Sequence, residues 1–166
     1  ASAYLAKLST MQMQDYFIKL DETKLEHHSL STDGALVGAT EHETNLKASF
    51  LLSFEELPDE NSKELFQMLA FTAPNQPFPI QTMVSLYQDE EELNLILHEV
   101  EKVSLVDVKN GDTTIHPLLA EFGQQLPDAK EALEKLAHVL ATTATQLNEY
   151  GLPKQVAPLY PHVIAT

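Results

Sequence analysis

Histidine is the residue type in this 166-residue chain best suited to chemistry, because the chain has seven histidines and no cysteine. His116 stands out, since it comes directly before Pro117 and an apolar run that ends at Phe122. An imidazole can donate a hydrogen bond to a phosphate oxygen in its neutral or its protonated form. The competing interpretation is that His116 ends a strand and packs against the turn that follows.

The other histidines offer weaker candidates. His27, His28 and His42 lie near glutamates in a polar stretch and could form a weak zinc or nickel site, but loop solvation is the simpler interpretation, so we predict no metal site. His98 begins a His-Glu pair that does not complete the His-Glu-x-x-His zinc pattern, because Lys102 occupies the last position.

Catalytic patterns are absent from the sequence. No serine, histidine and carboxylate form a nucleophilic arrangement, and no Gly-x-x-x-x-Gly-Lys-Ser/Thr loop occurs. The stretch from Gly34 to Gly38 is followed by Ala39 and Thr40, with no lysine in place. We therefore predict that this chain is not an enzyme and does not hydrolyse ATP by itself.

The charge balance argues against polyanionic partners. Ten basic residues, all of them lysine, stand against twenty-five acidic ones, for a net charge of −15. Arginine supplies the planar fork that best grips phosphates and guanine edges, and the chain has none. We therefore predict no nucleic-acid partner.

No apolar run approaches the ~20 residues that a bilayer span needs, and no basic-then-apolar leader is present. We therefore expect no membrane partner and a cytoplasmic location. The helical pattern of residues 1–8, with no methionine before it, indicates a chain that begins inside a helix, as a fragment would.

Apolar side chains recur at helical spacing in successive segments, with a long surface loop expected at 27–45. The spacing predicts helices at 11–25, 44–57, 60–70, 80–87 and 89–102. Strands are then predicted at 103–108 and 113–116, because the Asn110-Gly111 pair between them favours a tight hairpin turn. Three helices followed by a two-stranded hairpin is the order of a winged helix. Two further helices are predicted at 118–124 and 127–150, the second stopped by Gly151 and Pro153.

The predicted fold class is therefore mainly α: a winged helix, with three helices plus a two-stranded β-hairpin, flanked by helical segments. Residues 1–43 are expected to hold the end of a helical domain and a loop. Residues 44–125 form the winged-helix domain, and residues 126–166 form a helical linker or the start of helical repeats.

Three segments, in this order and at these intervals, resemble the winged-helix domain of NB-ARC or STAND signal-transducing ATPases: Leu51–Pro58, Leu65–Phe71 and Ile115–Phe122. The similarity covers roughly residues 1 to 125. In that family, a histidine directly after the second wing strand contacts the β-phosphate of bound ADP and locks the closed state, and His116 matches it. Ala120 departs from the family pattern, which often has a basic residue there, so a second phosphate contact is in doubt.

The resemblance implies a regulatory segment that couples the ADP/ATP state of an upstream nucleotide-binding domain to a C-terminal sensor or partner surface. Its partners would be intramolecular nucleotide-binding and repeat domains, with no cofactor held by this segment alone. One alternative is an interaction adaptor, in which the helices after Pro117 present an apolar groove to a protein partner. Another is a winged-helix DNA-binding regulator, although residues 89–102 carry six acidic residues and one lysine.

Overall fold

The computed structural model describes residues 41–165, and the chain divides into two compact units, Ala1–Glu56 and Leu57–Thr166. Helix α3 (Glu41–Glu55) is the described part of the first unit, with Ala48 and Leu52 buried. The helix begins at Glu41, so the loop prediction was wrong for residues 41–45. The rest of that loop and the helix predicted at 11–25 lie outside the described residues.

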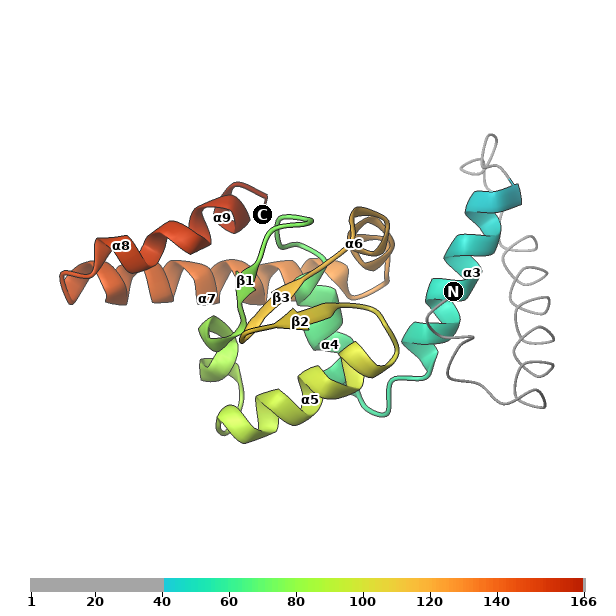
Figure 1. The fold of residues 1–166 in the computed structure, drawn as a ribbon, viewed down its shortest axis with the longest axis horizontal. Helices are drawn as coiled ribbons and strands as arrows, with labels where there is room; N and C mark the ends of the chain where they lie inside the picture. The colour runs from blue at the N-terminus through green and yellow to red at the C-terminus, as the bar shows by residue number, and fades with distance from the viewer. Residues whose placement is uncertain (1–40, 166) are drawn as a thin grey trace. The chain divides into compact units, whose positions relative to one another are not determined.

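The second unit opens as a winged helix, which confirms the predicted fold class (Figure 1). A helix, a strand, two helices and a hairpin follow one another: α4 (Glu60–Leu69), β1 (Phe78–Pro79), the 3-10 helix η1 (Ile80–Leu86), α5 (Glu90–Lys102), β2 (Asp107–Lys109) and β3 (Asp112–Thr114). The sheet has three antiparallel strands in the order β1-β3-β2, which is one strand more than the predicted two-stranded hairpin. That strand, β1, lies in the proline-rich stretch between the helices predicted at 60–70 and 80–87.

Aspartates start both long helices of the winged helix. The Asp59 side chain accepts a hydrogen bond from the Ser62 amide at 2.7 Å, and Asp89 accepts one from the Glu92 amide at 2.9 Å. These bonds satisfy amides that have no partner within the helix, and acidic side chains also suit the positive end of the helix dipole. The predicted starts of α4 and α5 are therefore confirmed.

The hairpin forms at the predicted Asn-Gly pair. Asn110 and Gly111 have φ values of 55° and 85°, as the favoured two-residue hairpin turn requires, and β2 pairs with β3 from Asp107 opposite Thr114 to Lys109 opposite Asp112. The strand predicted to begin at residue 103 begins only at Asp107, so that boundary was wrong.

The reason lies in how α5 ends. Ser104 has a φ of 63° and donates its amide to the Glu101 carbonyl at 2.8 Å, while the Leu105 amide bonds the Val100 carbonyl at 3.3 Å. This pair of bonds is the Schellman motif, in which a left-handed residue, usually glycine, ends a helix. Leu105 is fully buried, so the apolar run that resembled a strand anchors the end of the helix instead.

Five helical segments follow the wing: α6 (Pro117–Gln124), α7 (Ala129–Glu149), α8 (Pro153–Val156), η2 (Ala157–Leu159) and α9 (Tyr160–Ala165). Gly151, with a φ of 70°, ends α7 as predicted. The chain then turns back, and α8 packs against α7 while η2 packs against β1 (Figure 1). The tail is thus part of the same unit as the winged helix.

Helix α4 is the centre of the core, because it contacts α5, α6 and α7. Phe66 lies with its ring centroid 6.2 Å from that of Phe122 on α6. Burying each such side chain is worth roughly 1.5–3 kcal/mol. The most completely buried large side chains come from α4, β1, η1, α5, the residues just before β2 and just after β3, and α7: Leu65, Phe66, Met68, Leu69, Phe78, Ile80, Met83, Leu93, Leu105, Ile115, Leu136 and Leu140.

Candidate functional site

His116 lies at the junction between the wing and α6, where it is the N-cap residue of the helix. Pro117 occupies the first helical turn, and its fixed φ suits that position. The Leu118 amide donates to Nδ1 of His116 at 3.2 Å. On the other side of His116, Ile115 is buried and its carbonyl accepts a hydrogen bond from the Asn75 amide at 3.0 Å. The backbone is therefore fixed on both sides of the imidazole.

The capping bond also decides which imidazole nitrogen is left for a ligand. Because Nδ1 accepts from Leu118, the neutral ring carries its proton on Nε2. The side chain is exposed, and Nε2 has no hydrogen-bond acceptor within residues 41–165. Nδ1 thus has a structural role, and Nε2 is an exposed donor at the positive end of a helix.

Residue 120, where the pattern that the sequence resembles often has a basic residue, lies in the core. Ala120 is 2% exposed, while its neighbours Leu118 and Glu121 lie at the surface. A long basic side chain at position 120 would have to leave the core to reach a phosphate. This part of α6 therefore offers no cation beside His116.

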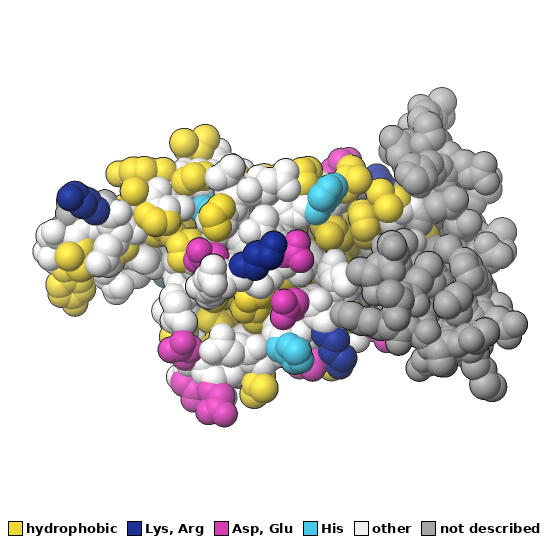
Figure 2. Space-filling model, viewed as in Figure 1, with side chains coloured by type: hydrophobic (Ala, Val, Ile, Leu, Met, Phe, Trp, Pro, Cys, Tyr) yellow, Lys and Arg dark blue, Asp and Glu magenta, His cyan; other side chains and the backbone are white. Residues whose placement is uncertain are grey.

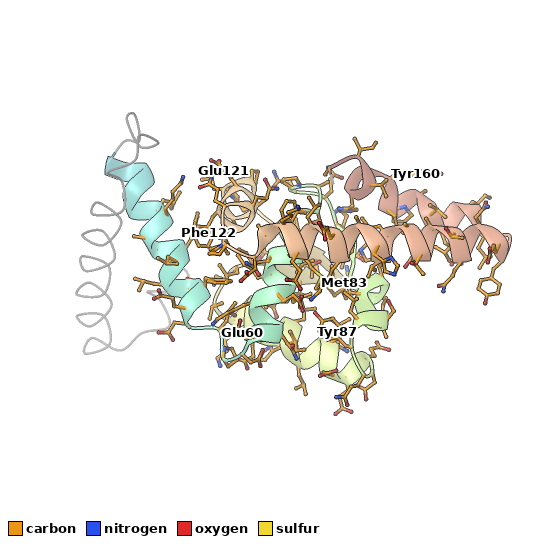
Figure 3. The ribbon with its side chains drawn as sticks, turned by 180° about the vertical axis from the view of Figure 1, so that it is seen from behind. Glu60, Met83, Tyr87, Glu121, Phe122 and Tyr160 are labelled. Atoms are coloured by element: carbon orange, nitrogen blue, oxygen red, sulfur yellow. The ribbon has the colours of Figure 1, made fainter. Side chains whose placement is uncertain are left out.

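A second polar site lies between α4, α5 and α7, away from the predicted residues. It is a hollow of about 360 Å³. Tyr87, labelled in Figure 3, follows η1 and is one of the residues that line the hollow. Its lining residues are Asn61, Glu64, Leu86, Tyr87, Gln88, Glu92 and Lys135.

The pKa values of two groups in this hollow, Tyr87 and Lys135, are shifted, but both groups keep their usual protonation at neutral pH. Burial raises the pKa of the Tyr87 phenol, and the nearby charges of Glu64, Glu92 and Asp59 raise it further. A hydrogen bond to Glu64 raises the pKa of Lys135, which also bonds Glu131 at 3.2 Å. Tyr87 therefore stays a neutral phenol and Lys135 an ammonium group. Neither is prepared to act as a base near pH 7.

No group of three or more histidine, aspartate or glutamate side chains that could hold a metal ion is found within residues 41–165. His98 lies 4.0 Å from Glu101 and makes no larger cluster. His27 and His28 fall outside the described residues.

Among the described helices, none combines the length and apolar character needed to cross a membrane.

His162 was not predicted as a site residue, but it is the most constrained histidine among the described residues. It lies on α9 and is fully buried, with its ring centroid 5.0 Å from that of Phe78. The Ala73 amide donates to Nδ1 at 3.0 Å, and Nε2 lies 3.1 Å from the Pro77 carbonyl. Since these partners are more than eighty residues away in sequence, no local pattern could have indicated them.

Comparison of the chain with protein-family models, curated proteins and solved structures finds no match. The interpretation of the site therefore rests on its own geometry and on the motif resemblance described above.

Proposed function

We propose that this chain is the regulatory winged-helix segment of a STAND or NB-ARC type nucleotide switch. It would couple the ADP or ATP state of an adjoining nucleotide-binding domain to a C-terminal sensor or partner surface. The observation that carries the proposal is the His116 imidazole, which is held by its Nδ1 and offers Nε2–H at the surface, directly after the second wing strand. An N–H at a helix start is well placed for a phosphate oxygen.

The surroundings of His116 support a switch better than a static phosphate site. A single imidazole gives weak phosphate affinity, so the adjoining domain would hold the nucleotide. His116 would contact its phosphate in one nucleotide state only. Helix α6 packs on α4, and the wing leads directly into α6 at His116, so a contact made or lost at His116 would move the winged helix as one body. The chain itself would then hold no cofactor and perform no catalysis.

A protein-interaction adaptor is the second candidate, and the surface of the tail favours it. Tyr160 is 57% exposed and Ile164 is 86% exposed, and Figure 2 shows hydrophobic side chains gathered over this C-terminal segment. Exposed apolar patches mark interaction surfaces. This candidate requires no nucleotide.

DNA binding is disfavoured by the helix that would have to enter the major groove. The outer face of α5 carries Glu90 and Glu91, both exposed, and its Lys102 is paired with Glu99 at 3.0 Å. Phosphate neutralisation supplies much of the affinity for DNA, and this helix repels phosphates. We expect no change in the fluorescence anisotropy of labelled duplex DNA at physiological salt, and a salt-dependent rise would overturn this.

The first test is the coding sequence upstream of Ala1 in the parent gene. A Gly-x-x-x-x-Gly-Lys-Ser/Thr loop within the preceding few hundred residues supports the switch. A start codon directly before Ala1 rejects it and leaves the adaptor.

A further inference from the structure

The tail, residues 153–165, is fastened to the winged helix by polar contacts of His162. Within this tail Val156 and Leu159 are buried apolar residues, and His162 is the buried polar one. Burial of these two apolar side chains holds the tail on the winged helix, but this attraction has no preferred direction. His162 fixes where the tail lies, because its ring makes two directional hydrogen bonds to the backbone of residues 73–77.

This pair of hydrogen bonds requires a neutral ring. Nδ1 must be unprotonated to accept from the Ala73 amide, so Nε2 carries the proton and donates it to the Pro77 carbonyl. A protonated ring has two donors and no acceptor. Protonation would place the Ala73 N–H opposite an N–H on Nδ1 in a buried site. The loss of this hydrogen bond would cost free energy in the closed state.

Among the described residues, the ring contacts the Ala73 amide, the Pro77 carbonyl and the Phe78 ring, none of which carries a negative charge. Residues 70–77, β1 and η2 contain no titratable side chain. The buried face of α7 consists of Ala129, Ala132, Leu136, Val139 and Leu140. Apart from His162 itself, none of the titratable side chains of α7, α8 and α9 is buried, and Asp112 of β3, which pairs with Pro79, is partly exposed.

Residues 73–77, which His162 contacts, are also hydrogen-bonded to the backbone beside His116. The Asn75 amide lies between the two His162 contacts and donates to the Ile115 carbonyl at 3.0 Å. Phe78, which contacts the His162 ring, pairs with Thr113 of β3. Residues 73–78 therefore connect the tail to the backbone directly before His116.

We propose that residues 153–165 form a latch, closed by neutral His162 and released when His162 is protonated, and that its release loosens the Asn75–Ile115 contact beside His116. The link to His116 rests on the proposed function, whereas the latch itself does not. The latch gives the switch a second input, which is proton concentration.

The direction of the pH effect follows from the state that binds the proton more tightly. Burial lowers the pKa of His162 in the closed state, although its bond to Pro77 opposes this, while a released histidine has its ordinary pKa of about 6.5. The closed latch is therefore fully stable above about pH 6.5 and loses stability as the pH falls from there through the lowered pKa. One proton is involved, so the opening equilibrium constant rises by at most about tenfold per pH unit.

Amide hydrogen exchange followed by NMR tests the latch on the chain without nucleotide, from about pH 7.5 to about pH 5. After correction for intrinsic exchange rates, protection of the Ala73 amide and of the α9 amides should fall by up to about tenfold per pH unit below about pH 6.5. A pH-independent Ala73 amide in the wild-type chain overturns the latch.

His162→Gln separates titration from packing, because an amide side chain accepts and donates hydrogen bonds but does not titrate in this range. The variant should lose the pH dependence of Ala73 protection even if the tail is held less tightly throughout. His138→Gln, at an exposed position on α7, is the matched control and should keep the wild-type profile. The same pH dependence in His162→Gln as in wild type rejects His162 as the switch.

The Asn75 amide tests the connection to His116. It should lose protection in parallel with Ala73, because both belong to the segment that the latch holds. If Ala73 opens while Asn75 stays protected, the latch is local and the connection to His116 is wrong. None of these readouts requires nucleotide, so failure of the proposed nucleotide switch would leave them unchanged.

Discussion

Gly123 of α6 and Ala70 at the end of α4 approach so closely that a β-carbon on residue 123 would lie 2.5 Å from that of Ala70. The same atom would lie 3.3 Å from the Phe66 ring. The absence of a side chain at Gly123 thus sets the distance between α6 and the central helix. Since His116 caps α6, this contact also sets where the imidazole lies.

Gly123→Ala should lower the free energy of unfolding by about 1–3 kcal/mol, because the new methyl group overpacks the contact. Alanine gains up to about 1 kcal/mol of helix propensity, so the net loss should fall in the lower part of that range. Chemical denaturation measures it.

The matched control for Gly123→Ala is the double variant with Ala70→Gly, which removes the facing methyl group. The double variant should be more stable than the sum of the single changes predicts, since the two sites are in contact. Additive effects would show that the helices separate without cost and that Gly123 does not set their spacing.

Ser62 is fully buried in α4, and its hydroxyl oxygen has no hydrogen-bond partner among the described residues. Ser62→Ala should raise the free energy of unfolding by about 1 kcal/mol, because an unpaired buried hydroxyl is removed and helix propensity improves. Thermal denaturation checks this.

Thr72 provides the contrast for Ser62, because its buried hydroxyl donates to the Leu69 carbonyl at 2.7 Å. Thr72→Val should therefore destabilise the protein by about 1 kcal/mol. A loss of stability in Ser62→Ala as large as that in Thr72→Val would mean that the Ser62 hydroxyl has a partner.

The hairpin turn depends on Gly111, whose φ is 85°. Gly111→Ala should cost about 1–2 kcal/mol, because a β-carbon is disfavoured in the left-handed region although space for it is open. Asn110→Gly is the control, since glycine also adopts the φ of 55° found there, and it should change stability little. Equal losses for both variants would indicate that side-chain contacts, rather than backbone conformation, hold the turn.

Much of the fold could be predicted because its signals are local. Asp59 and Asp89 start helices, Asn110 and Gly111 form the turn, and Gly151 ends α7, each through interactions within a few residues. These signals also gave the order of a winged helix. They could not give β1, a two-residue strand whose pairing with β3 depends on residues more than thirty positions away.

The strand boundary at residue 103 was wrong because Ser104 takes a conformation that the sequence would indicate only with glycine. His116 could be singled out from its neighbours Ile115 and Pro117. His162 could not, because its role depends on the distant Ala73 and Pro77. Long-range contacts of this kind leave no periodicity in the sequence.

The proposed switch predicts a full-length product with a nucleotide-binding domain, and retention of ADP by that product tests the central claim most directly. After purification without added nucleotide, the wild-type protein should contain bound ADP, and His116→Ala should retain much less, because the Nε2–H donor to the phosphate is lost. His98→Ala, at an exposed histidine of α5, is the control and should retain as much as wild type. Equal ADP content in His116→Ala and wild type, or no nucleotide in either, would contradict the role proposed for His116.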